Sequence, residues 1–220
     1  MNMMNNYGQQ NPFENPMKGT TTVALRFKDG VVVATDRRAS AGTFVASKRA
    51  KKLHQLNDYT VATIAGLVAD AQYLVNLTKA NLNLYELNRG YPPTTKMAGN
   101  LLASILYEQF RSYMPFYVAM LVCGLDKYGP HVYNLDASGA IIDEDYASTG
   151  SGSLFSYGVL EAFWKEGLTE DEAIKLGLRA LSTSISRDTA TGNGMDALVV
   201  NKDGIRWLTE EEIKKILEEL

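Results

Sequence analysis

The sequence predicts an α+β fold in which two antiparallel sheets pack face to face and pairs of helices cover their outer faces. Three observations predict it. Strand-like segments follow one another through short turns, so they are expected to pair antiparallel. Stretches with helical periodicity come in pairs between the blocks of strands. The order of strands and a helix pair occurs twice before a last hairpin and a short helix, which indicates segregated layers rather than a parallel sheet.

The first block of strands follows an Asn/Gln/Pro-rich leader that ends at Gly19. Its strands are apolar, alternating or β-branched, and they are bounded by turn residues such as Asp29-Gly30 and Asn57-Asp58. These segments cover residues 21–27, 31–36, 51–56 and 59–66.

A period of three to four residues then predicts the first helix pair. One face of the first helix carries Ala71, Leu74, Val75, Thr78, Leu82 and Tyr85. Gly90 and Pro92 end this helix, and a second helix is expected from Thr94 to about residue 113, before Pro115.

The second half repeats this order. Its strand-like segments cover residues 116–126, 130–136 and 140–148. A helix is expected over residues 153–165, and a second begins with a capping box at 169–172, where a hydroxyl and a carboxylate satisfy reciprocal backbone donors. A hairpin over 195–208 and another capping box at 209–212 predict the last two elements.

Composition limits the class of protein. A chain of 220 residues with a formal charge of −3 suits one domain and offers no strong field for nucleic acid or an anionic membrane. No apolar run is long enough to span a bilayer, and the leader lacks the basic start and apolar core of a secretory signal. Cys123 is the only cysteine, which suits a cytosolic protein. The leader's composition predicts disorder.

The common catalytic motifs are absent from the sequence. The only histidines, His54 and His131, have no partner at metal-ligand spacing, and one cysteine cannot form a zinc site. There is no G-x-S-x-G elbow and no phosphate-binding loop, and Phe155 interrupts the G-x-G-x-x-G pattern. We therefore expect neither a metal nor a cofactor.

A hydrolase without a catalytic histidine can use a nucleophile at its own amino terminus. A free α-amino group has a pKa of about 8, so part of it is neutral at pH 7 and can activate the hydroxyl of the same residue. Thr20, directly after the leader and the small Gly19, has the position that this chemistry requires.

The sequence resembles the β-type subunits of the archaeal 20S proteasome over essentially everything after the leader. The matching segments occur in the family's order and at compatible spacing: KGTTTV, VVVATDRRAS, KKLHQL, TIAGLVADAQ, YASTGSGS, YGVLE and SRDTATGNGMDA. The resemblance implies the four-layer αββα sandwich of the N-terminal-nucleophile hydrolases. It also implies a propeptide over residues 1–19, removed by the subunit itself between Gly19 and Thr20, and a single catalytic domain over 20–220.

The resemblance also implies roles for individual residues. Thr20 corresponds to the family's nucleophile, Asp36 to its acidic partner and Lys52 to its essential lysine. An ammonium beside the Thr20 hydroxyl would stabilise a developing alkoxide, and a carboxylate would hold that ammonium in place.

Four further positions correspond to the family's catalytic machinery. The backbone N–H of Gly66 would form the oxyanion hole, and Ser151, Asp188 and Thr191 would hold the terminal amine and a catalytic water. Two positions depart from the family pattern: Thr191 stands where serine is usual, with its hydroxyl kept, and Ala24 stands where glycine is usual.

The implied substrate pocket is apolar. Its lining corresponds to Ala39, Ala50, Ile64 and Val68, with His54 and Gln72 nearby. The absence of a charged floor predicts cleavage after hydrophobic residues. Ser40 is expected to pair its backbone with an extended substrate, as an added strand would.

The family implies a setting as well. We expect a ring of seven β-type subunits stacked on α-type subunits, an ATPase partner, unfolded polypeptides as substrates and a cytoplasmic location. The basic cluster of Lys48, Arg49, Lys51 and Lys52 is then not a nucleic-acid site.

Three alternatives stay open. A structural β-type subunit would not cut, although the intact Thr20, Asp36, Lys52, Ser151 and Asp188 argue against it. The bacterial two-ring threonine peptidase shares the fold, but the long leader, the last hairpin and helix, and the YASTGSGS segment favour the archaeal type. A different N-terminal-nucleophile amidohydrolase would act on small amides.

Overall fold

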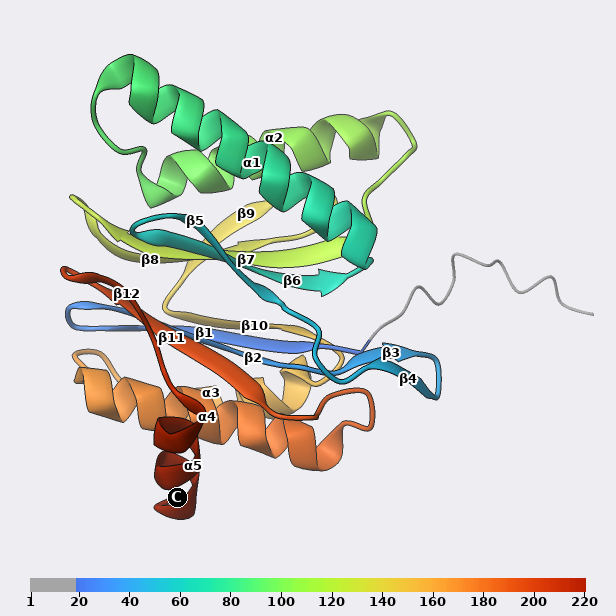
Figure 1. The fold of residues 1–220 in the computed structure, drawn as a ribbon, viewed down its shortest axis with the longest axis vertical. Helices are drawn as coiled ribbons and strands as arrows, with labels where there is room; N and C mark the ends of the chain where they lie inside the picture. The colour runs from blue at the N-terminus through green and yellow to red at the C-terminus, as the bar shows by residue number, and fades with distance from the viewer. Residues whose placement is uncertain (1–18) are drawn as a thin grey trace, which may run out of the picture.

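Two five-stranded antiparallel sheets lie face to face in the computed structural model, and a pair of helices covers each outer face (Figure 1). The α+β prediction and its four layers are confirmed. The structure describes residues 19–220. Gly19 is the one leader residue among them, so the predicted disorder of the leader lies outside the described residues.

The first sheet has the strand order β10-β1-β2-β11-β12. Its strands are β1 (Thr21–Phe27), β2 (Gly30–Asp36), β10 (Tyr146–Gly150), β11 (Met195–Asn201) and β12 (Gly204–Trp207). The sheet is covered by α3 (Ser153–Phe163) and α4 (Glu170–Arg187), and α5 (Glu210–Glu218) packs beside α4 (Figure 1). This sheet carries the segment that follows the leader on one of its inner strands.

The second sheet has the strand order β5-β6-β7-β8-β9. Its strands are β5 (Leu53–Asn57), β6 (Thr60–Gly66), β7 (Val118–Asp126), β8 (Gly129–Leu135) and β9 (Ile141–Glu144). It is covered by α1 (Val68–Arg89) and α2 (Thr95–Arg111). The predicted helical face is confirmed, because five of its six residues are buried and only Tyr85 is half-exposed.

Strand alternation divides the apolar core into three layers. Val23 and Leu25 of β1 pack with the helices α3 and α4, whereas Ala24 between them faces the other sheet. The layer between the sheets includes Ala24, Val33, Val61, Leu121, Cys123, Ala147 and Leu198, all buried. Cys123 is fully buried in this layer, and its burial raises the pKa of the thiol. The methyl group of Ala24 therefore lies in this middle layer.

Two parts of the strand prediction are wrong. Residues 140–148 do not form one strand, because the chain leaves the second sheet after β9 and enters the first sheet as β10, on either side of Asp145. A two-stranded hairpin of β3 (Ala39–Ala41) and β4 (Phe44–Ser47) is missing from the prediction. It has no apolar alternation to detect, because most of its side chains are half-buried or exposed.

Both predicted capping boxes are present. The hydroxyls of Thr169 and Thr209 accept from the amides of Glu172 and Glu212, and each carboxylate accepts from the amide of its threonine. Among the described residues, no helix has the length and apolar character needed to span a bilayer.

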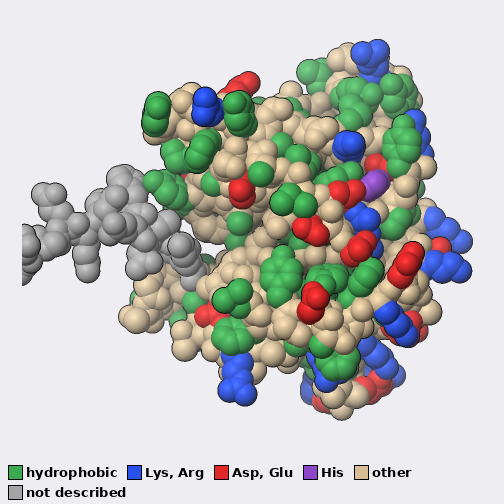
Figure 2. Space-filling view, turned by 180° about the vertical axis from the view of Figure 1, so that it is seen from behind, with side chains coloured by type: hydrophobic (Ala, Val, Ile, Leu, Met, Phe, Trp, Pro, Cys, Tyr) green, Lys and Arg blue, Asp and Glu red, His purple; other side chains and the backbone are tan. Residues whose placement is uncertain are grey.

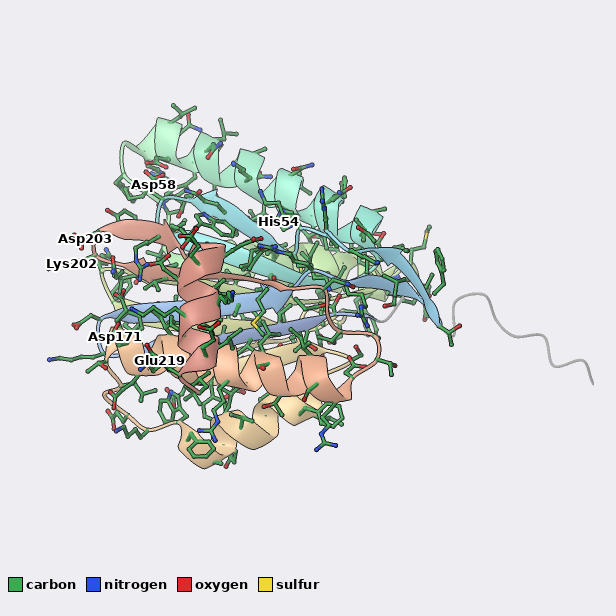
Figure 3. All side chains as sticks on the ribbon, turned by 60° about the horizontal axis from the view of Figure 1, so that its bottom comes forward. His54, Asp58, Asp171, Lys202, Asp203 and Glu219 are labelled. Atoms are coloured by element: carbon green, nitrogen blue, oxygen red, sulfur yellow. The ribbon has the colours of Figure 1, made fainter. Side chains whose placement is uncertain are left out.

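Turns from the two sheets meet at one end of the sandwich. Asp58, in the turn between β5 and β6, lies beside Lys202 and Asp203, in the turn between β11 and β12 (Figure 3). A side chain built on Gly204 would be 3.7 Å from the Asp58 carbonyl oxygen. At the opposite end of β1 the chain reaches Thr20.

Candidate active site

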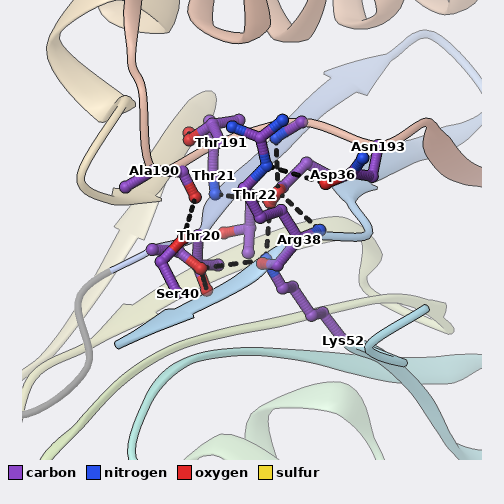
Figure 4. Close-up of polar contacts among 12 residues, drawn as sticks. Thr20, Thr21, Thr22, Asp36, Arg38, Ser40, Lys52, Ala190, Thr191 and Asn193 are labelled. Carbon is purple, nitrogen blue, oxygen red and sulfur yellow. Dashed lines mark hydrogen bonds and ion pairs between the residues drawn. The ribbon is translucent and has the colours of Figure 1, made fainter. Parts of the chain in front are cut away.

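The strand ends from both sheets bring the predicted residues together. Thr20 directly precedes β1, Asp36 ends β2 and Ser151 follows β10, all in the first sheet. Lys52 directly precedes β5 and Gly66 ends β6, in the second sheet. Figure 4 shows Thr20, Asp36 and Lys52 within one connected set of hydrogen bonds and ion pairs.

The hydroxyls of the Thr20-Thr21-Thr22 run have different partners, as expected from the alternation of a strand. Thr20 Oγ1 donates to the Gly19 carbonyl oxygen at 2.7 Å. Thr21 Oγ1 lies 2.8 Å from Thr191 Oγ1. Thr22 Oγ1, fully buried, lies 2.7 Å from Thr149 Oγ1 on the neighbouring strand β10.

The Gly19–Thr20 peptide bond lies in a tight slot. The Gly19 carbonyl oxygen accepts from Thr20 Oγ1 and from Lys52 Nζ, the latter at 3.2 Å. A Cβ atom at Gly19 would be 2.6 Å from Ser40 Cβ and 2.7 Å from the Ala190 carbonyl oxygen. Only glycine therefore fits between these two neighbours without displacing them.

Lys52 and Asp36 form a buried ion pair beside this bond. Lys52 Nζ lies 2.7 Å from Asp36 Oδ1, and the two residues are 4% and 0% exposed. Lys52 also donates to the Arg38 carbonyl oxygen. Burial lowers the pKa of Lys52, and the nearby Asp36 carboxylate opposes that shift.

Asp36 is held by the backbone as well as by lysine. Its two oxygens accept from the amides of Thr21 at 2.8 Å, Gly192 at 2.9 Å and Arg38 at 3.0 Å. These three donors satisfy a carboxylate that has no contact with solvent. They also fix the orientation of the Asp36 carboxylate toward Lys52 Nζ.

A second carboxylate, Asp188, organises the hydroxyls on the other side of Thr20. Asp188 Oδ2 accepts from Ser151 Oγ and from Thr191 Oγ1, both at 2.5 Å. Ser151 Oγ lies 3.4 Å from the Thr20 nitrogen and 3.3 Å from the Thr20 carbonyl oxygen. Thr191 thus supplies a hydroxyl that donates to this carboxylate.

A cavity of about 500 Å³ lies next to Thr20. Its lining residues are Gly19, Thr20, Ala65, Gly66, Tyr117, Val118, Ala119, Ala137, Gly150 and Ser151. Gly66 has φ +119°, and a Cβ there would lie 2.1 Å from the Tyr117 carbonyl oxygen. Only glycine fits the backbone that β6 needs at this point.

The predicted substrate-pocket residues do not line this cavity. Ala39 is on β3 and Ala50 precedes β5, both half-buried, whereas Ile64 on β6 is 5% exposed and Val68 at the start of α1 is 42% exposed. Ser40 is buried, and its hydroxyl donates to the Ala190 carbonyl oxygen at 3.2 Å. The specificity pocket and the strand-like pairing at Ser40 stay predictions.

Sequence reasoning did not single out three contributors to the site. Thr21 holds Thr191 through its hydroxyl, and the Gly192 amide and the Arg38 amide and carbonyl hold Asp36 and Lys52. The last two act through backbone atoms, for which residue type carries no signal. For Thr21 the sequence did offer a signal. It is a hydroxyl residue next to Thr20, and the alternation of a strand directs its side chain to the opposite face, toward a different partner.

The two histidines lie elsewhere. His54 on β5 has Nε2 3.2 Å from the Lys51 carbonyl oxygen, and burial lowers its pKa. His131 on β8 lies 3.3 Å from Asp126 and 3.2 Å from the Tyr133 hydroxyl. Within the part of the chain that the structure describes, no group of three or more His, Cys, Asp or Glu side chains has the arrangement of a metal site.

The basic cluster of the sequence separates in space. Lys52 is buried in the site, whereas Lys48, Arg49 and Lys51 are exposed and line a surface hollow with Arg37 and Trp207. On the rear face of the molecule, acidic and basic groups are interspersed with apolar ones, without a continuous basic stripe (Figure 2).

Comparisons with known proteins agree with one another. A family model described as proteasome subunit matches residues 17–200. The chain is similar to a proteasome subunit beta of Methanopyrus kandleri, with 43% identity over 91% of this chain and 96% of that protein. It is 45% identical to a proteasome subunit beta of Methanoregula boonei over 93% of this chain and 96% of that protein. A proteasome subunit beta 1 of Korarchaeum cryptofilum is 42% identical, over 93% of this chain and 98% of that protein.

Proposed function

This chain belongs to the proteasome subunit family as a β subunit of archaeal type, and from that premise we propose that it is a catalytic one, a threonine endopeptidase made as an inactive precursor. One observation carries the proposal. The Thr20 hydroxyl and the Lys52 ammonium both donate to the carbonyl oxygen of Gly19, at 2.7 and 3.2 Å. A nucleophile and a cation therefore meet at the one peptide bond whose cleavage would free the Thr20 amine.

Self-processing begins at that bond. Thr20 Oγ attacks the Gly19 carbonyl carbon, while Lys52 stabilises the negative charge that develops on the carbonyl oxygen. The carbon–nitrogen bond then breaks, the hydroxyl proton ends on the Thr20 nitrogen, and Gly19 is left as an ester on Thr20 Oγ. Water hydrolyses this ester, so the leader departs with a carboxylate and Thr20 regains its hydroxyl.

The free amine then replaces histidine as the base. It accepts the proton of Thr20 Oγ as that oxygen attacks a substrate carbonyl, and it returns the proton to the leaving amine. An ester between substrate and enzyme forms and is hydrolysed by water. Ser151 and Asp188 are suited to orient the amine, because Ser151 Oγ lies 3.4 Å from the Thr20 nitrogen and 2.5 Å from Asp188. Gly66, in the same cavity, would donate to the oxyanion.

The proposed substrates are unfolded polypeptides, cut after hydrophobic residues. The apolar character of Ala39, Ala50, Ile64 and Val68 supports this preference. The proposed setting is a cytoplasmic ring of seven β-type subunits, stacked on α-type subunits and supplied by an ATPase. Such an enclosure would keep a protease of broad preference away from folded proteins.

Intact-mass measurement of the purified protein tests the proposal directly. The wild-type chain, produced together with α-type subunits, is expected to begin at Thr20, whereas Thr20→Ala keeps residues 1–19 and cuts neither casein nor hydrophobic fluorogenic peptides. Thr20→Ser keeps a hydroxyl and is expected to retain processing. Thr183→Ala on α4 is the matched control, because within the described part of the chain its hydroxyl donates only to the Arg179 carbonyl oxygen, in its own helix.

Two of the alternatives, the structural subunit and the small-amide hydrolase, have their own result in this experiment. A wild-type chain that keeps its leader in the assembled particle would indicate a structural subunit. Hydrolysis of small amides without cleavage of casein would indicate a different amidohydrolase. Peptidase activity in Thr20→Ala would remove Thr20 as the nucleophile.

A further inference from the structure

Three buried threonine hydroxyls form a connected cluster between the two sheets, two or three residues along the chain from the site. Thr22 Oγ1 lies 2.7 Å from Thr149 Oγ1 and accepts from Thr63 Oγ1 at 3.2 Å. Thr63 Oγ1 in turn accepts from the Leu121 amide at 3.2 Å. Thr22 and Thr63 are 0% exposed and Thr149 is 6% exposed. We call Thr22, Thr63 and Thr149 the hydroxyl clasp.

The clasp joins three strands that belong to both sheets. Thr22 on β1 and Thr149 on β10 are directly opposite each other in the first sheet. Thr63 lies on β6 of the second sheet, so its bond to Thr22 crosses the space between the sheets. A cross-strand hydroxyl pair opposes a change of register, and the bond from Thr63 opposes sliding of one sheet over the other.

Each strand of the clasp leads to one part of the site. Thr20 precedes Thr22 by two residues, Ser151 follows Thr149 by two, and Gly66 follows Thr63 by three. The proposed nucleophile, the serine whose hydroxyl lies 3.4 Å from its nitrogen, and the proposed oxyanion donor are thus each a short distance along a strand from one shared hydroxyl cluster. Apolar contacts would hold the sheets together, but they resist sliding less than directional bonds do.

The three hydroxyls of the clasp lie in apolar surroundings. Ala24, Leu121 and Ala147 next to them belong to the apolar layer between the sheets. A hydroxyl in such a layer costs stability unless it is hydrogen-bonded, and here each hydroxyl has a partner. Each threonine carries a single hydroxyl proton. Because Thr63 gives its proton to Thr22, the proton of Thr22 is available for Thr149, and donation runs in one direction from the Leu121 amide.

We propose that the hydroxyl clasp sets the distance between Thr20 and Gly66 across the two sheets, and that Thr22 is a positioning residue for the cleavage reaction. The inference rests on the proposed function for its effect on the reaction rate. Misplacement by about 1 Å can lower a rate by about 10²-fold, so a small shift of β1 against β6 would be measurable.

The test compares Thr22→Val, which keeps the shape and removes the hydroxyl, with Thr22→Ser, which keeps the hydroxyl. Thr22→Val is expected to lower kcat and the rate of leader removal by about 10- to 100-fold, with KM changed far less. Thr22→Ser is expected to recover most of the loss. The control is Thr60→Val. Thr60 lies on β6, the strand that also carries Thr63, is 1% exposed, and has its hydroxyl 3.5 Å from the Thr95 hydroxyl, outside the clasp. This variant is expected to lower stability without lowering kcat.

Hydrogen exchange separates a failure of this inference from a failure of the proposed function. In a Thr20→Ala background, which cannot process itself, Thr22→Val is expected to speed exchange in peptides that cover residues 62–67 and 147–152 more than Thr60→Val does. A wild-type protein without peptidase activity would refute the proposed function and leave this comparison valid.

The inference is overturned if Thr22→Val processes and cleaves at the wild-type rate, if serine does not restore the rate, or if exchange at those two segments is unchanged. Should Thr22→Val fail to fold, Thr63→Val carries the test, because it removes the bond between the sheets and keeps the Thr22–Thr149 pair. It is expected to lower kcat and leader removal in the same way, and normal rates would overturn the inference.

Discussion

Lys52 Nζ lies 2.7 Å from Asp36 Oδ1, and this buried ion pair links the two sheets, because Asp36 ends β2 and Lys52 directly precedes β5. The two partners depend on it unequally. Asp36 also accepts from three backbone amides, whereas the other acceptors of Lys52 among residues 19–220 are the carbonyl oxygens of Gly19 and Arg38. Under the proposed cleavage Gly19 would leave with the leader, and the processed chain would then keep still fewer partners for the ammonium.

Loss of either partner should stop the reaction but should affect stability differently. Breaking a buried pair commonly costs about 3–5 kcal/mol, since an unpaired charge is left behind. Lys52→Met should cost less than this, because three amides still satisfy Asp36, and Asp36→Asn should cost more than Lys52→Met. Urea unfolding of both variants in a Thr20→Ala background measures the order. Equal losses, or leader removal by Lys52→Met in an otherwise wild-type chain, would contradict the prediction.

Gly19→Ala should slow removal of the leader. Its new methyl group would be 2.6 Å from Ser40 Cβ and 2.7 Å from the Ala190 carbonyl oxygen, so the scissile carbonyl must move away from Thr20 Oγ and Lys52. We expect a rate about 10-fold or more below wild type. The fraction of unprocessed chain, followed by intact mass after synthesis, gives the rate. Ser40→Gly in the same chain should recover part of it, and a normal rate in Gly19→Ala would refute the steric argument.

Gly66→Ala should lose both activity and stability. At φ +119° the new side chain would be strained, and its Cβ would lie 2.1 Å from the Tyr117 carbonyl oxygen, which must shift together with the cavity wall. We expect a cost of about 1–3 kcal/mol and loss of peptide cleavage. Gly158→Ala on α3 is the control, since nothing lies within 4 Å of its Cβ position. It should raise the unfolding midpoint slightly, and equal behaviour of the two variants would be the contrary result.

The capping box of α4 should make stability depend on acid pH. Hydrogen bonds from the Thr169 backbone, with further bonds from Lys165 and the Thr169 hydroxyl, lower the pKa of Glu172 to about 2. Because the folded pKa is below the unfolded one, the stabilisation is complete above about pH 4.5 and is lost as pH falls toward 2. The difference in denaturant midpoint between wild type and Glu172→Gln should therefore shrink over that interval.

The control for this prediction is Glu211→Gln at the start of α5. The Glu211 side chain is exposed and has no hydrogen bond or ion pair among the described residues. Its substitution removes an acidic side chain from the first turn of a helix without breaking a capping box, so at pH 7 it should lower the denaturant midpoint less than Glu172→Gln does. Equal effects of the two substitutions at pH 7 would show that the Glu172 carboxylate contributes nothing specific to the cap.

Local chemistry made much of the fold predictable. The capping boxes at Thr169 and Thr209 and the buried face of α1 depend on residues three or four apart, so the sequence displays them directly. The split between β9 and β10 at Asp145 was not predictable in this way, because a strand pattern does not reveal which sheet will receive it. The exposed β3–β4 hairpin had no pattern to reveal it at all.

The candidate site shows the same division. The order of the motifs was enough to nominate Thr20, Asp36, Lys52, Gly66, Ser151, Asp188 and Thr191, and the structure brings them to one end of the sandwich. Strand alternation alone indicates that neighbouring threonines have different partners. The sequence could not tell which partners, because Thr21 meets Thr191 and Thr22 meets Thr63 only after distant strands have paired.

By itself the sequence determined most of the helices and strands, the apolar faces that require two sheets and two helix pairs, and the candidate residues for the chemistry. Only the tertiary structure decided that the Gly19 carbonyl oxygen receives both a hydroxyl and an ammonium, and that buried hydroxyls join the sheets behind Thr20. Local propensity acts between residues a few positions apart. Hydrogen-bond geometry between residues dozens of positions apart is set by how whole strands pack, which no short segment encodes.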